Sequence, residues 1–143
     1  MGTSTFRFSD DPGNTTFYCG LDVHKYVLAV AIYAYDDSKH EFIKSETFGT
    51  DERGLNMFWG FVETYCPISF TMEATNVYHH VVATFLDDKK KSAGWTYTVL
   101  IVNPADASGI PGRQKHDRLD ATLLAKYTAA GLLKSGKPIV VSP

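Results

Sequence analysis

The chain has 143 residues, of which 44% are hydrophobic and 21% charged, and its formal net charge is −2. This size and composition fit one ordinary globular domain, while no apolar run approaches the ~18 residues of a membrane span and no signal peptide is visible. The two cysteines, Cys19 and Cys66, are expected to be buried free thiols in an intracellular, cytoplasmic protein without a membrane partner. The slight negative charge differs from the basic surplus of most stand-alone nucleic-acid-binding domains.

The first half of the chain predicts a strand meander followed by a helix. Residues 1–16 are polar and turn-rich, which is typical of a flexible N-terminal tail. Three strand-like runs follow at about 17–23, 27–35 and 41–48, separated by short turns, and they predict antiparallel pairing. Apolar residues at helical spacing then predict a helix at 54–65.

The second half alternates strands and helices. The expected elements are a strand at 68–72, a helix capped by Thr75 or Asn76 and running to about 91, a strand at 96–102, and a helix opened by Asp117 that runs to about 133. The order β-β-β-α-β-α-β-α predicts an α/β fold with a mixed five-stranded sheet and helices on both faces.

Two acidic residues stand at the ends of apolar strands, where packing alone does not favour them. Asp22 lies within the run FYCGLDV, and Glu73 follows ISFTM. Aspartate is depleted in strands, and ligands of open sheets gather beyond the carboxyl ends of parallel strands. Each acid also has a structural explanation, because Asp22 could start a turn and Glu73 could stabilise the N-terminus of the next helix.

A second acidic pair, Asp117 and Asp120, occurs in the segment GRQKHDRLDA. Its spacing resembles a capping box at a helix N-terminus, and it also places both carboxylates on one helix face. If these two acids converge with Asp22 and Glu73, a cation is needed to offset their repulsion, and oxygen ligands suit Mg²⁺ or Mn²⁺. The pattern therefore indicates a metal-dependent phosphoryl-transfer site, with His24 and His116 as neighbours that could assist proton transfer or phosphate contact.

Three segments together resemble the IS110-type transposase family. They read GLDVHKYVLAVAIY, TMEATNVYHHVV and VLIVNPADASGIPGRQKHDRLDATLLAKYTAAGLL, and they span about residues 17–134. The resemblance implies a RuvC-like catalytic domain of ribonuclease H fold at 17–134, carrying a DEDD tetrad. In this chain the tetrad is Asp22, Glu73, Asp117 and Asp120, which would act as the catalytic residues and as the ligands of two Mg²⁺ or Mn²⁺ ions.

The resemblance also implies partners and a wider domain plan. Family members cleave and exchange DNA strands, some with a structured guide RNA, and the complete proteins are expected to form homo-oligomers. Arg113, Lys115 and Lys126 are then candidates for nucleic-acid phosphate contacts. Residues 135–143 are expected to be a truncated linker to a C-terminal transposase domain absent from this chain.

Two other functions fit parts of the pattern. The slight negative charge and the missing C-terminal domain favour a guide-RNA- or DNA-binding assembly module that has no nuclease activity on its own. A sugar-kinase-like phosphotransferase would share the first-strand aspartate, but no glycine-rich phosphate loop follows a strand here.

Overall fold

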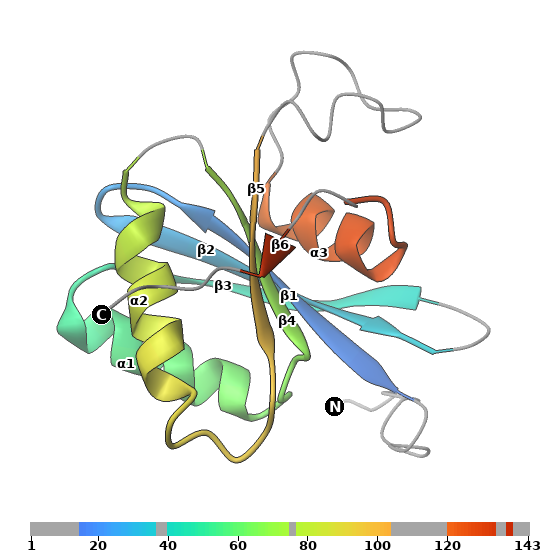
Figure 1. Cartoon of the computed structure of the whole chain (residues 1–143), viewed down its shortest axis with the longest axis horizontal. Coiled ribbons are helices and arrows are strands. Elements are labelled where there is room, and N and C mark those ends of the chain that lie inside the picture. The colour runs from blue at the N-terminus through green and yellow to red at the C-terminus, as the bar shows by residue number, and fades with distance from the viewer. Residues whose placement is uncertain (1–14, 37–39, 75–76, 104–119, 134–136, 139–143) are drawn as a thin grey trace.

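The computed structural model describes residues 15–36, 40–74, 77–103, 120–133 and 137–138. Within them the chain forms six strands and three helices (Figure 1). In chain order these are β1 (Thr16–Val23), β2 (Val27–Tyr35), β3 (His40–Gly49), α1 (Glu52–Glu63), β4 (Ser69–Glu73), α2 (His79–Lys89), β5 (Thr98–Val102), α3 (Ala121–Ala129) and β6 (Lys137–Pro138).

All six strands belong to one mixed sheet with the order β3-β2-β1-β4-β5-β6. The first three strands pair antiparallel as a meander, whereas β4 pairs parallel with both β1 and β5. The five expected strands and their order are confirmed, and β1 lies in the middle of the sheet between β2 and β4. The two-residue β6 adds a sixth, antiparallel strand at the β5 edge.

Helices cover both faces of the sheet, as expected, with α1 and α2 on one side and α3 on the other (Figure 1). The main core lies under α1 and α2, because alternate residues of β1, including Cys19 and Leu21, point toward these helices and are fully buried. Phe58 of α1 packs against Phe70 of β4 with ring centroids 6.1 Å apart. The core therefore fixes which face of β1 is left for α3.

Helix α3 lies directly against β1 at Gly20. A Cβ atom added at Gly20 would lie 1.8 Å from the Ala121 carbonyl oxygen and 2.8 Å from the Ala125 backbone nitrogen. Both distances are far below van der Waals contact, so only glycine permits this approach. The hydroxyl groups of Thr128 and Thr71 form a 2.8 Å hydrogen bond that joins α3 to β4 as well.

Helix boundaries differ from expectation in two places. Helix α2 begins at His79 after Tyr78, which offers no side-chain cap, so the prediction that Thr75 or Asn76 caps it was wrong. Helix α1 begins two residues earlier than expected because the Asp51 side chain accepts a 2.8 Å hydrogen bond from the Gly54 amide. A side-chain acceptor rather than apolar spacing thus decides where α1 starts.

Both cysteines are free thiols, as predicted. Cys19 is fully buried in the core, whereas Cys66 is exposed, which corrects the expectation that both would be buried. Cys66 follows α1 in a tight turn with φ of 50°, outside the packed elements. Among the described helices, none has the length and apolar character needed to cross a bilayer.

Candidate active site

The register of the parallel strands places Asp22 and Glu73 at the same level of the sheet. The last paired residues of β1 and β4 are Leu21 and Met72, and the two acids follow directly after them. Residues in register on neighbouring parallel strands point to the same face, so both carboxylates occupy one end of the two central strands. This arrangement supports the expectation that the two acids are neighbours.

Both acids lie on the face of the sheet that α3 covers. Side chains on a strand alternate between faces, so Asp22 shares the face of Gly20, against which α3 packs. Likewise, Glu73 shares the face of Thr71, whose hydroxyl contacts Thr128 of α3. Helix α3 therefore covers the same sheet surface from which the two carboxylates project.

Asp120 joins this region as the N-cap residue of α3. Its backbone is extended, and its Oδ1 atom accepts a 2.9 Å hydrogen bond from the Leu123 amide. Asp22 and Asp120 line one open cleft of about 380 Å³ beside the β3 residues Ser45, Glu46 and Thr47. The fold thus brings together two acids that are 98 positions apart in the sequence.

The role of Asp120 corrects the expected helix start. The sequence interpretation made Asp117 the first helical cap and placed Asp120 on a shared helix face three residues later. Helix α3 instead begins at Ala121, and Asp120 itself provides the cap, because its ψ of 177° is not helical. Asp117 lies outside the described residues.

The carboxylate of Asp22 is contacted by a histidine from the turn that follows β1. His24 Nε2 lies 3.2 Å from Asp22 Oδ2, and the two side chains are 44% and 17% exposed, respectively. The glutamate is more enclosed, because Glu73 is 9% exposed at the end of β4. Holding a charged carboxylate in such a position is costly unless a partner or cation offsets the charge.

The donor chemistry of this region fits a hard divalent cation. Asp22, Glu73 and Asp120 supply carboxylate oxygens, the ligand type that Mg²⁺ and Mn²⁺ prefer. The helix cap uses Oδ1 of Asp120, so its Oδ2 atom can take a second role. Across the described ranges, no group of three or more His, Cys, Asp or Glu side chains is gathered tightly enough to hold an ion. The described acids therefore share one end of the sheet without forming a closed cage.

The basic residues proposed for nucleic-acid contact are only partly described. Arg113 and Lys115 lie outside the described residues, together with His116. Lys126 is exposed in the last turn of α3, six residues or about 9 Å along the helix axis from Asp120. A lysine at this position also interacts favourably with the helix C-terminus, and it does not line the cleft that contains Asp22.

The cleft also contains residues that sequence reasoning missed. One wall is formed by the β3 residues Ser45, Glu46 and Thr47. The Glu46 Oε2 atom lies 3.6 Å from the Lys44 ammonium. The pairing of β2 with β3 brings Thr47 beside Ala29, which in turn pairs with Asp22. Nothing local to β3 signals this role, because it depends on two successive strand registers.

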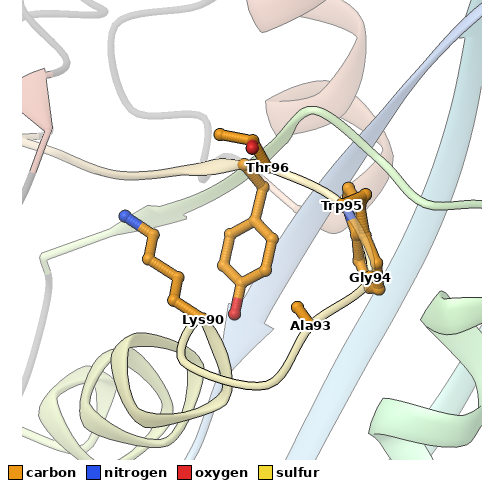
Figure 2. A pocket seen from close by; sticks show the side chains of 6 residues that line it. Lys90, Ala93, Gly94, Trp95 and Thr96 are labelled. Atoms are coloured by element: carbon orange, nitrogen blue, oxygen red, sulfur yellow. The ribbon is translucent and has the colours of Figure 1, made fainter.

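A second cavity of about 310 Å³ lies far from these acids, beside the start of β5 (Figure 2). Lys90, Trp95 and Thr96 line it, and the Lys90 ammonium lies 5.6 Å from the centre of the Tyr97 ring. Because β4 and β5 are parallel, the start of β5 is at the opposite end of the sheet from Glu73. This cavity is therefore separate from the carboxylate site. The lysines after α2 are explained by their favourable interaction with the C-terminus of that helix.

Structural comparison identifies similar folds in viral enzymes. The chain is similar to the fowlpox virus Holliday junction resolvase, with 19% identity, a TM-score of 0.51 and coverage of 62% of each chain. It is also similar to the fowlpox virus resolvase in complex with substrate Holliday junction DNA, with 14% identity and a TM-score of 0.51, covering 84% of this chain and 98% of that one. These likenesses support the ribonuclease H-like, RuvC-like α/β fold that the motifs implied.

Sequence comparison identifies the family. A search of curated proteins found no match. The model of the DEDD_Tnp_IS110 family, described as a transposase, matches residues 19–139 and therefore includes most of β1, all of β4 and α3, and all four acids of the expected tetrad. The chain belongs to the DEDD_Tnp_IS110 transposase family.

Proposed function

We propose that this chain cuts DNA strands by divalent-metal-dependent phosphoryl transfer, as the nuclease domain of a transposase. The observation that carries the proposal is the placement of Asp22 and Glu73 side by side at the ends of two central parallel strands. Asp120, at the start of α3, lines one cleft together with Asp22. Three carboxylates from separate parts of the chain at one end of a sheet fit a cation site better than three unrelated helix caps or turns.

Each described acid has a distinct part in the proposed site. Asp22, on the central strand, would hold the metal ions together with Glu73 and Asp120, and the family resemblance adds Asp117 as the fourth ligand. Two bound Mg²⁺ or Mn²⁺ ions would supply charge stabilisation at the attacking and leaving oxygens of an in-line displacement. His24, at 3.2 Å from Asp22, would fix the orientation of that carboxylate.

The comparisons support DNA as the substrate class. Membership of a transposase family implies action on DNA, and the similar fowlpox virus structure was determined with Holliday junction DNA. Branched DNA is therefore a suitable first substrate, beside plain duplex. A structured guide RNA and self-association of the complete protein are further proposals that rest on the family resemblance alone.

The test combines metal binding with strand nicking. Calorimetric titration with Mn²⁺ and nicking of supercoiled DNA are measured for the wild type, Asp22→Asn and Glu73→Gln. We expect both substitutions to weaken Mn²⁺ binding at least about tenfold and to remove nicking, because each deletes a charged ligand. Asp88→Asn is the matched control, since Asp88 is an exposed acid paired with Lys91 at 3.5 Å.

The outcomes separate the two functions that the sequence left open. Loss of nicking in the Asp22 and Glu73 variants alone supports the nuclease. DNA or RNA binding with no nicking under any metal condition would instead favour the non-catalytic assembly module. Mn²⁺ binding that neither substitution changes would contradict the shared cation site.

A further inference from the structure

The short turn between β1 and β2 presents an aromatic ring to solvent beside the candidate active site. Tyr26 is 72% exposed, the largest exposure among the large hydrophobic residues in the described part of the chain. The Lys25 ammonium lies 5.1 Å from the centre of the Tyr26 ring. A single exposed apolar residue is ordinary, so the surroundings of this ring decide whether its position has a function.

The turn is held in place by hydrogen bonds to the β3–α1 junction. The Thr50 hydroxyl donates to the Lys25 carbonyl oxygen at 2.7 Å, and the Thr50 amide donates to the Tyr26 carbonyl oxygen at 3.3 Å. The His24 amide donates to the Val27 carbonyl oxygen at 2.9 Å, which closes the turn itself. The backbone that carries Tyr26 is therefore fixed, and a rigid aromatic platform binds with little loss of conformational entropy.

The ring borders an open cavity of about 470 Å³ whose lining combines aromatic, cationic and hydroxyl groups with one carboxylate, that of Asp51, which caps α1. The lining residues are Lys25, Tyr26, Gly49, Thr50, Asp51 and Tyr78. Flat aromatic faces with an adjacent lysine are the features by which proteins bind single-stranded nucleic acids: bases stack on the rings and the cation contacts the phosphate. The chemistry of the cavity thus fits a nucleotide better than an apolar ligand.

The position of the turn ties this cavity to the acids. His24 of the turn contacts Asp22, and only four residue steps separate Asp22 from Tyr26, so their Cα atoms are at most about 15 Å apart. At the duplex rise of 3.4 Å per nucleotide that distance spans about four nucleotides, and a more extended unpaired strand spans it with fewer. Among the described residues, the cavity shares no lining residue with the cleft of Asp22 and Asp120, and Tyr78 packs against the core under α1 and α2. A DNA strand with its scissile phosphate at the acids would therefore reach Tyr26 by passing over the end of β1.

We propose that the Lys25–Tyr26 turn is a binding subsite for an unpaired nucleotide of the DNA strand that is cut, with Tyr26 stacking on the base and Lys25 contacting a phosphate. This inference rests on the proposed nuclease function, which supplies the neighbouring phosphate. It assigns a role to two residues outside the carboxylate tetrad.

The test measures binding of the full chain to a short single-stranded DNA containing 2-aminopurine, in EDTA so that no strand is cut. We expect Tyr26→Ala to weaken binding roughly 5- to 150-fold and to reduce the quenching of 2-aminopurine, whereas Tyr26→Phe retains both. Lys25→Gln should lower the slope of log affinity against log salt by about 0.7, the value for one lost phosphate contact. Phe42→Ala is the matched control, because Phe42 is 44% exposed near the opposite end of β3.

The results separate this inference from the proposed function. If Tyr26→Ala binds DNA like the wild type, or if the wild type does not bind it, the subsite is wrong, even where Mn²⁺-dependent nicking by the acids is intact. If binding depends on Tyr26 but no variant nicks, the stacking of a DNA base on Tyr26 is supported, and the nuclease proposal fails together with the claim that the bound strand is the one that is cut. The inference would also be overturned if Tyr26 stacked on bases of an RNA of the same sequence but not on DNA. It would likewise be overturned if Tyr26→Ala changed the oligomeric state without changing the affinity for DNA.

Discussion

Replacing Gly20 by alanine tests whether the contact between β1 and α3 positions Asp120 at the cleft. The new Cβ atom would lie 1.8 Å from the Ala121 carbonyl oxygen, and real Cβ contacts are essentially never below 3.0 Å. Restoring the shorter contact to 3.0 Å requires a displacement of about 1.2 Å. Because the obstructing atoms belong to the backbone of α3, the helix and its N-cap residue must move together.

Two effects of this displacement have different magnitudes. Overpacking of a well-packed site costs about 1–3 kcal/mol of folding stability. Alanine in a strand recovers about 0.5–1 kcal/mol relative to glycine, so the clash outweighs the gain. A shift of about 1 Å in a catalytic group can lower activity about 100-fold, so we expect nicking to fall more steeply than stability.

Urea denaturation gives the free energy of unfolding, and nicking of supercoiled DNA gives the activity. Gly60→Ala is the matched control, because a Cβ atom at Gly60 meets nothing within 4 Å and alanine favours the helix. Wild-type stability and activity in Gly20→Ala would refute the reasoning that a glycine-dependent contact places α3.

Three further predictions follow from single residues. Asp120→Asn should keep the stability of α3, since asparagine caps helices as well as aspartate, but it should weaken Mn²⁺ binding. Asp120→Ala should weaken Mn²⁺ binding and also lower the free energy of unfolding, measured in urea, by about 1 kcal/mol. Equal stability of the two variants would contradict the role of Asp120 as the helix cap. Under native conditions a thiol reagent should modify the exposed Cys66 rapidly and the buried Cys19 only on unfolding. Burial also raises the pKa of the Cys19 thiol well above its usual value, which lowers its reactivity further. Mass spectrometry of the labelled peptides checks the order of modification. Burial also raises the pKa of Tyr97, whose hydroxyl donates to the Leu86 carbonyl oxygen, so folding favours the protonated phenol. This contribution to stability is fully present below pH ~10 and is lost as the pH rises toward the folded-state pKa. Between pH 9 and 11, about one unit either side of the unfolded-state pKa, Tyr97→Phe should therefore lose less stability than the wild type. Urea midpoints of the two proteins that change in parallel with pH would contradict this.

The sequence determined the local elements and the type of chemistry. The continuous apolar run VLAVAIYAY predicted β2 at 27–35, the bounds that the structure has, because a short apolar run bounded by turn residues is typical of a buried strand. Asp22 was recognisable as a candidate because a carboxylate in an apolar strand is costly without a function. Helix ends were less determined: the sequence interpretation placed the cap of the last helix at Asp117, and the structure gives that role to Asp120.

Only the tertiary structure decided which of these residues meet. Asp22 and Glu73 are neighbours because β1 pairs parallel with β4 in the register that joins Leu21 to Met72. The β3 wall of the cleft depends on a second register, which contains a shift between Ile32 and Tyr33. Local patterns fix which face of a strand is buried, but hydrogen bonds between segments distant in sequence fix its neighbours and its register, so the composition of the site appears only when the sheet is assembled.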